Sequence, residues 1–144
     1  MLDAATVAQC AEAFGSIRAM FEKTVAYSKE RQQFGRAIGQ FQSLQHRMVD
    51  MLIACEQASS IVQHASLCLG GEEITRKKTT SACKVTVGRM GRMVGQSAVQ
   101  IHGAIGITDQ LDVTQHFRRV EVFNLRLGTI DEHVSRYVEL LNAV

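Results

Sequence analysis

Two stretches of the chain carry residues suited to binding a charged ligand. The first runs from Arg31 to Gln42 and contains two arginines, two phenylalanines and two glycines. Arg31 supplies a planar, permanently charged group that pairs with phosphate or carboxylate, and Gln42 offers both a donor and an acceptor. Gly35 and Gly39 let the backbone turn where a helix must stop. Taken alone, this stretch fits a plain connection between helices as well as a binding site.

The second stretch, from Gln100 to Asp109, is rich in glycine. Gly103 and Gly106 carry no side chain, so the backbone there can come within hydrogen-bonding range of a ligand. A turn that only caps a helix is the alternative interpretation of this stretch. The presence of both stretches in one chain, separated by two long helical patterns, favours a shared binding function.

Together the two stretches resemble the C-terminal domain of acyl-CoA dehydrogenases. The family's first pattern, a tyrosine followed by Arg-x-x-Phe-Gly and Phe-Gln, matches Tyr27, Arg31, Phe34, Gly35, Phe41 and Gln42. Its second pattern, Gln-x-x-Gly-Gly-x-Gly, matches Gln100, Gly103, Ala104 and Gly106. Ala104 departs from the pattern, because the family has glycine there. The resemblance extends from about Asp3 to Tyr137.

The resemblance implies that flavin adenine dinucleotide (FAD) lies across a subunit interface. Arg31 would then meet the pyrophosphate, with Phe34 and Gln42 beside the adenine end. The second stretch would approach the same cofactor, and Thr129 would either contact it or cap the last helix. The residues assigned to the cofactor on this basis are Arg31, Phe34, Gln42, Gln100, Ile101, His102, Gly103, Ala104 and Thr129.

The family reaction removes an α-proton from an acyl-CoA thioester and therefore needs a positioned carboxylate. In many members this is a glutamate directly before a Gly-Thr pair, but here Leu127 precedes Gly128 and Thr129. Other members carry the glutamate on the first helix, at the position of Ala5, next to Thr6. Neither leucine nor alanine accepts a proton. We therefore expect no catalytic residue at either place.

Three other carboxylates lie near in sequence. Asp131 and Glu132 fall in the first turn of the last helix, where negative charge complements the helix dipole. We favour that structural role for them over catalysis, and Glu121 is the remaining candidate. His102 and His116 lack the spacing of metal ligands, so we expect no metal site.

Apolar residues recur at steps of three and four along most of the chain, which indicates helices packed lengthwise. The clearest seam comprises Leu44, Met48, Met51, Cys55, Ala58, Val62, Ala65 and Leu69. We expect helices from Asp3 to about Arg31, from Phe41 to Gly70, over 79–101, over 112–123 and from about Thr129, with loops at 33–40 and 102–110. Short links between helices predict antiparallel neighbours. The expected fold is all-α: an up-and-down four-helix bundle with an additional short helix and no sheet.

Composition agrees with one helical domain spanning residues 1–144. The chain has no proline or tryptophan, and a net charge of +2 gives no reason to expect nucleic acid as a partner. No apolar run is long enough to span a membrane. The four cysteines, Cys10, Cys55, Cys68 and Cys83, have no Cys-x-x-Cys spacing, so we expect reduced thiols in a cytoplasmic protein.

The resemblance thus implies the flavin-binding and oligomerisation domain of an acyl-CoA dehydrogenase-like oxidoreductase, inactive by itself. The family's N-terminal helical domain and middle β-domain are expected to be absent. Expected partners are acyl-CoA, an electron-transfer acceptor, and either further copies or an unlike subunit. The stretches 45–51 and 116–119 resemble the small-subunit type exemplified by pimeloyl-CoA dehydrogenase. The alternatives are a flavin-dependent monooxygenase or oxidase of the same fold, or a non-enzymatic assembly domain. The acyl chain and the electron acceptor stay open.

Overall fold

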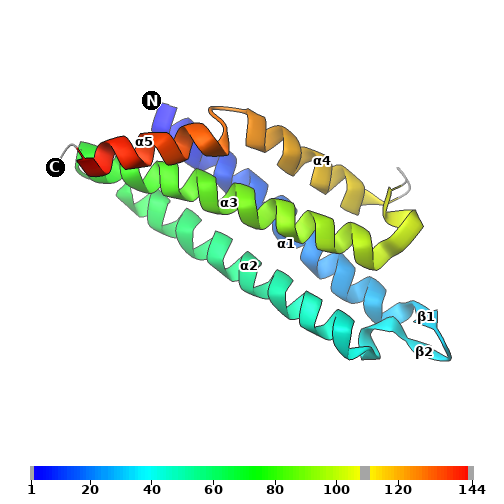
Figure 1. Cartoon of the computed structure of the whole chain (residues 1–144). Helices are drawn as coiled ribbons and strands as arrows, with labels where there is room; N and C mark the ends of the chain where they lie inside the picture. The colour runs from blue at the N-terminus through cyan, green and yellow to red at the C-terminus, as the bar shows by residue number, and fades with distance from the viewer. Residues whose placement is uncertain (1, 108–110, 143–144) are drawn as a thin grey trace.

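Five α-helices make up most of the computed structural model, which describes residues 2–107 and 111–142. They are α1 (Leu2–Glu30), α2 (Gln42–Cys68), α3 (Glu73–His102), α4 (Asp112–Leu125) and α5 (Ile130–Asn142). The first three run antiparallel in turn, and α4 and α5 follow one another along the same side of the bundle (Figure 1). The all-α, up-and-down bundle is confirmed. The fourth position of the bundle is occupied by two short helices, α4 with 14 residues and α5 with 13, where one long helix and one short helix were expected.

Helix α3 is the central element, because it packs against each of the other four α-helices. Its glycines make this close packing possible. A Cβ added at Gly91 would lie 2.7 Å from a methyl group of Val120, and one added at Gly95 would overlap the ring of Phe117. The small residues of α3 therefore serve helix approach, as their spacing predicts.

The seam predicted along α2 lies in the core. Its middle residues, Met51, Cys55, Ala58, Val62 and Ala65, are buried. Leu44, Met48 and Leu69, at the two ends, are partly buried against them. On α1, Cys10 and Ile17 are buried as expected, and Phe14 and Phe21 pack beside the core.

Helix α3 begins at Glu73, six residues earlier than the predicted start at Thr79. The reason is a helix cap. The carboxylate of Glu72 accepts hydrogen bonds from the backbone N–H groups of Ile74 (3.0 Å) and Thr75 (2.9 Å). This satisfies donors that a helix N-terminus otherwise leaves unpaired.

The connection between α1 and α2 contains two short antiparallel strands, β1 (Gln32–Gln33) and β2 (Arg36–Ala37), where no sheet was expected. Phe34 and Gly35 form the turn between them and have φ values of 54° and 77°. A short 3₁₀ helix, Ile38–Gln40, leads into α2. A second 3₁₀ helix, Gly103–Ile107, follows α3.

Helix α5 is less buried than its apolar spacing predicts. Ile130, Val134 and Tyr137 are only half-buried and Leu141 is exposed, while Val144 lies outside the described residues. The buried residue of this helix is His133. The physical reason is that α5 packs mainly on α3, so a single face is covered.

All four cysteines are free, as expected, and three of them are buried. Among the described residues, no helix is both long enough and apolar enough to cross a membrane.

Candidate functional site

The two sequence stretches meet in one open pocket of about 490 Å³, called here the hairpin pocket. It lies where the C-terminal ends of α1 and α3 approach the β1–β2 hairpin. These ends share one end of the bundle because α1 and α3 run in the same direction (Figure 1). From the first stretch and its surroundings come Tyr27, Arg31, Gln33, Phe34, Ile38, Phe41, Ser43 and Leu44. From the second come Gln100, Ile101, His102, Gly103 and Ala104.

A ring stack joins the two stretches at the base of this pocket. The rings of Tyr27 and His102 lie 4.4 Å apart, centroid to centroid. His102 is buried, and its Nδ1 lies 2.8 Å from the carbonyl oxygen of Ala98. Because a carbonyl only accepts, Nδ1 donates this hydrogen bond. The stack fixes the distance between the end of α1 and the end of α3.

Arg31 follows the last residue of α1 and is exposed. Its backbone is held at both sides, since its N–H donates to the Tyr27 carbonyl (2.9 Å) and its carbonyl accepts from the Ile38 N–H (2.8 Å). Within the described part of the chain its guanidinium forms no salt bridge. The cation is therefore available to an anionic ligand.

Phe34 combines two features that are costly in an isolated chain. Its side chain is 92% exposed, and its φ of 54° is left-handed, a conformation that non-glycine residues rarely adopt. The ring makes an edge contact with Phe41 at 6.2 Å, and the Arg36 guanidinium lies 4.1 Å from the centroid of the Phe41 ring. Strained backbone and an exposed aromatic ring together are typical of a site that another molecule covers.

Two of the nine predicted cofactor residues do not line the hairpin pocket. Gln42 is the first residue of α2 and is exposed outside it. Thr129 lies at the start of α5, where its hydroxyl accepts from the Glu132 N–H (3.3 Å) and its own N–H donates to the Glu132 carboxylate (2.6 Å). This reciprocal pair is a capping box. Sequence reasoning did not assign Ile38 and Leu44 to the site, although both lie within or beside the first stretch.

A second pocket, of about 470 Å³, lies at the turn between α4 and α5 and is called here the Leu127 pocket. It is lined by Leu2, Thr6, Leu127, Gly128, Glu132, His133 and Arg136. It brings Leu127 together with Thr6, the neighbour of Ala5. Of the two positions expected to lack the glutamate, Leu127 lines this pocket, whereas Ala5 does not.

The nearby acidic residues have structural partners. The N–H and hydroxyl of Thr129 hold the pKa of the Glu132 carboxyl below its usual range. Glu121 pairs with Arg92 through two hydrogen bonds of 3.0 and 2.8 Å. Asp131 does not line the pocket. The sequence favours a structural role for Glu132, as a negative charge in the first turn of the helix, and the structure adds that Glu132 is part of the helix cap.

Two buried side chains hold the turn that presents Leu127, whose φ is 52°. Lys84 of α3 is fully buried, and its ammonium donates to the carbonyl oxygens of Phe123 and Arg126 (2.8 Å to the latter). His133 of α5 donates from Nε2 to the Leu127 carbonyl at 2.9 Å. Sequence reasoning missed both residues. The only available signal was a lysine within an otherwise apolar part of α3.

Burial lowers the pKa of both groups, because removal from water disfavours the charged form. The neutral His133 ring also accepts at Nδ1 from the Ser81 hydroxyl, 3.2 Å away. The turn is therefore held by one buried cation and one neutral ring.

Acidification is expected to destabilise the chain through His133. Its folded pKa lies below the usual value of about 6.5, so the unfolded chain takes up a proton first as the pH falls. The free energy of unfolding then decreases from about pH 6.5 downwards. Urea unfolding between about pH 7.5 and about pH 5 checks this. His133→Gln should flatten the pH dependence, with the half-buried His116, whose pKa is also lowered by burial, contributing the remainder, whereas His46→Gln, at an exposed site, should leave it unchanged.

Among the described residues, no group of three or more histidine, cysteine or acidic side chains is placed to hold a metal ion.

Comparison with known proteins matches residues 1–138 to the family model for the acyl-CoA dehydrogenase C-terminal domain. Acyl-CoA dehydrogenase IpdE2 of Mycolicibacterium smegmatis is 35% identical over 138 residues, covering 94% of this chain and 42% of that protein. The structure of butyryl-CoA dehydrogenase from Megasphaera elsdenii superimposes with a TM-score of 0.92 at 27% identity, over 98% of this chain and 37% of that one. PigA, solved with FAD and proline, gives 0.89 at 26% identity over the same shares. The chain thus spans less than half the length of these relatives. It belongs to the acyl-CoA dehydrogenase family, as a C-terminal helical domain.

Proposed function

We propose that this chain is the flavin-binding and self-associating domain of an FAD-dependent acyl-CoA dehydrogenase that lacks a catalytic carboxylate of its own. The observation that carries the proposal is the hairpin pocket, in which Arg31 and Phe34 face residues 100–104. When bound, FAD supplies the acceptor for the hydride removed from the acyl chain. The domain's own contribution is to bind and orient the cofactor.

The residues present fit such a dianionic, aromatic cofactor. The Arg31 guanidinium forms no salt bridge within the described residues and suits a pyrophosphate, because its paired donors match phosphate oxygens. The exposed Phe34 ring offers a flat apolar surface beside it. Gly103 and Ala104 lie exposed at the rim, so the Ala104 methyl group does not block the pocket from within this chain.

We propose that the remaining contacts to the cofactor and all contacts to the thioester end of the substrate come from parts of the protein outside this chain. Relatives such as IpdE2 are more than twice its length, and the hairpin pocket is open to solvent on one side. We infer that an N-terminal helical domain and a middle β-domain complete the site. We further propose that a separate protein accepts the electrons from the flavin. We also propose a cytoplasmic location, which suits the free thiols.

Self-association is supported by exposed apolar residues on α2. Val49, Leu52 and Ile53 are all exposed on one part of this helix, close to the half-buried Met90 and Met93 of α3. Monomeric proteins rarely leave such a patch uncovered. We propose that a second copy, or an unlike subunit of the same family, packs there.

A flavin-dependent oxidase or monooxygenase is the second candidate. Leu127 in place of a glutamate fits a reaction that needs no carboxylate at this position. PigA, which was solved with proline, shows that relatives of this fold also take ligands other than acyl-CoA. A panel of acyl-CoA thioesters, tested without oxygen and with a partner subunit that supplies the carboxylate, separates a dehydrogenase from a monooxygenase. The rate at which oxygen reoxidises the reduced flavin separates it from an oxidase.

Replacing Arg31 with alanine in the full-length protein is expected to weaken FAD binding about 10- to 100-fold, the usual effect of losing hydrogen bonds to a charged group. Flavin fluorescence during titration of the apoprotein measures the dissociation constant. Arg47→Ala is the matched control, because Arg47 is exposed on α2 away from the hairpin pocket. Equal losses in the two variants would contradict the proposal, since charge alone would then explain binding.

A further inference from the structure

The last turns of α2 carry a histidine and a cysteine on the same face. His64 is exposed and Cys68, the last residue of the helix, is partly exposed, whereas the other three cysteines are buried. Residues four apart on a helix are neighbours on its surface, and no other histidine and cysteine of the sequence have this spacing. The two side chains are in contact, since the Sγ atom of Cys68 lies 3.9 Å from Nε2 of His64.

This pair has the geometry of two neighbouring ligands of a tetrahedral metal ion. Zinc binds a thiolate sulfur at about 2.3 Å and an imidazole nitrogen at about 2.0–2.1 Å, which places the two ligand atoms about 3.5 Å apart. A small side-chain rotation closes the observed separation of 3.9 Å to that value. The two groups can therefore chelate one ion while the helix stays as it is. Zinc peptidases likewise hold their metal with two ligands four residues apart on one helical face.

Charge and ligand type select the kind of ion that suits this pair. Thiolate and imidazole groups bind zinc and similar ions, whereas magnesium and calcium take oxygen ligands. The position favours a cation, because Cys68 ends α2 and the C-terminal end of a helix carries a partial negative charge. His46 and Asp50, also on α2, have the same spacing but offer a carboxylate in place of sulfur. They provide an internal control.

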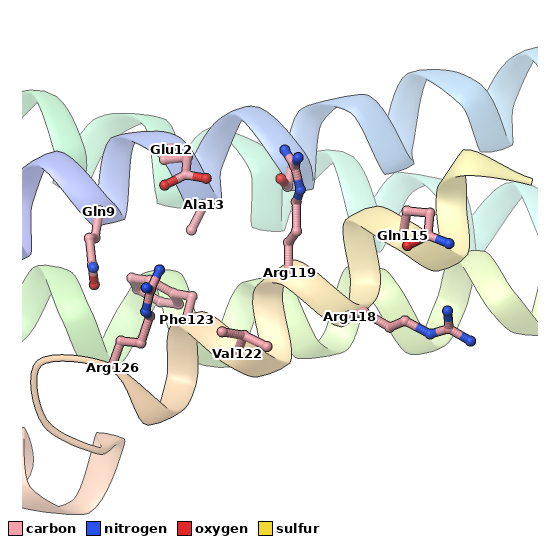
Figure 2. A pocket seen from close by; sticks show the side chains of 10 residues that line it. Gln9, Glu12, Ala13, Gln115, Arg118, Arg119, Val122, Phe123 and Arg126 are labelled. Atoms are coloured by element: carbon pink, nitrogen blue, oxygen red, sulfur yellow. The ribbon is translucent and has the colours of Figure 1, made fainter. Parts of the chain in front are cut away.

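The groove between α1 and α4 is the opposite kind of surface (Figure 2). It has a volume of about 310 Å³ and is lined by Arg118, Arg119 and Arg126, with Glu12 on the facing helix. None of the described residues that line it is a histidine or a cysteine. Its guanidinium groups repel a cation, so we expect no metal ion to compete for binding there.

We propose that His64 and Cys68 form a binding site for one divalent cation of the zinc class. The Cys68 thiol passes its proton to solvent, and its sulfur and the His64 Nε2 each donate an electron pair to the ion. Water fills the two remaining tetrahedral positions. Because only half of the ligands of a structural zinc site are present, the expected dissociation constant is on the order of 10 µM. The site is independent of the proposed function, since neither residue lines the hairpin pocket or the Leu127 pocket.

The first test uses Co²⁺ as the probe, because a bond between cobalt and a thiolate gives an absorption band in the near ultraviolet. The reduced chain is titrated without oxygen. We expect a saturable band at one ion per chain, which Zn²⁺ displaces and Mg²⁺ does not. Cys68→Ser should abolish the band, and His64→Gln should weaken Co²⁺ binding about tenfold or more, because one of two ligands is lost. His46→Gln should leave the band and the affinity unchanged.

Three results of this titration would overturn the proposal. A band that survives Cys68→Ser would assign the sulfur to one of the buried cysteines. An unchanged affinity in His64→Gln would show that the cysteine binds the ion without the histidine. The third is the absence of any saturable band up to about 1 mM Co²⁺.

The second test measures stability and uses Zn²⁺ alone. An ion that binds the folded chain shifts the unfolding equilibrium towards it, by up to about 100-fold when the free ion is at one hundred times its dissociation constant. Urea unfolding of the wild-type chain with and without Zn²⁺ measures this shift. The shift should vanish in Cys68→Ser and persist in His46→Gln. Equal shifts in the wild-type chain and Cys68→Ser would contradict the site, because zinc would then act elsewhere on the chain.

Discussion

Replacing Lys84 with alanine is expected to lower the free energy of unfolding by about 3–5 kcal/mol. The fully buried side chain is the donor for the carbonyl groups of Phe123 and Arg126, and its ammonium lies 3.6 Å from the centroid of the Phe123 ring. Alanine removes these bonds and leaves a cavity where the stem was. Relief of the cost of burying a charge, which lowers the Lys84 pKa, offsets only part of the loss.

Urea unfolding of the variant measures this effect, and two substitutions calibrate it. Lys84→Met keeps the stem and loses only the ammonium, so its cost should be about 1–3 kcal/mol. Lys29→Ala, at an exposed site in the last turn of α1, should cost about 1 kcal/mol or less. A Lys84→Ala variant as stable as Lys29→Ala would show that the two carbonyl groups find other donors.

The parts of this fold that were predictable are those set by local periodicity. The α2 seam from Leu44 to Leu69 and the buried face of α3 follow from apolar spacing, since a helix with one apolar stripe must cover it. The meeting of Arg31 with Gln100 was expected from two motifs, and the parallel directions of α1 and α3 provide the physical reason. The two helical faces depend on residues that lie close together in sequence, whereas the meeting of Arg31 with Gln100 was expected only from the resemblance.

The unpredicted parts depend on contacts between distant segments. Lys84 and His133 hold the Leu127 turn from different helices, and a sequence pattern cannot show which carbonyl groups a buried lysine will meet. Burial on α5 was overestimated, because periodicity identifies an apolar face but not whether a neighbour covers it. Thr129 was assigned by resemblance either to the cofactor or to the cap of the last helix. Its hydrogen bond with Glu132 forms the cap, and the sequence alone did not distinguish the two roles.

Replacing Leu127 with glutamate in the full-length protein is expected to accelerate flavin reduction by acyl-CoA about 10²–10⁴-fold, the usual contribution of a positioned general base. Residue 127 lines the Leu127 pocket from a turn held by Lys84 and His133, so a new carboxylate there would lie at that pocket. The left-handed backbone adds no new penalty, because Leu127 already adopts it with φ of 52°. Anaerobic stopped-flow bleaching with a panel of acyl-CoA thioesters gives the rate.

Leu127→Gln is the matched control, since glutamine has the shape of glutamate without its basicity, and it should stay as slow as the wild-type chain. Glu132→Gln should also leave the rate unchanged, because that carboxylate is held by Thr129 in the capping box. Fast bleaching by the wild-type protein alone would contradict the absence of a base. In that case Glu121 is the next carboxylate to replace, although two hydrogen bonds hold it to Arg92. Two results together would define the partner's role: an unlike subunit restores fast bleaching to the wild-type chain, and Leu127→Glu bleaches fast without that subunit. The partner would then contribute to catalysis only by supplying the missing carboxylate.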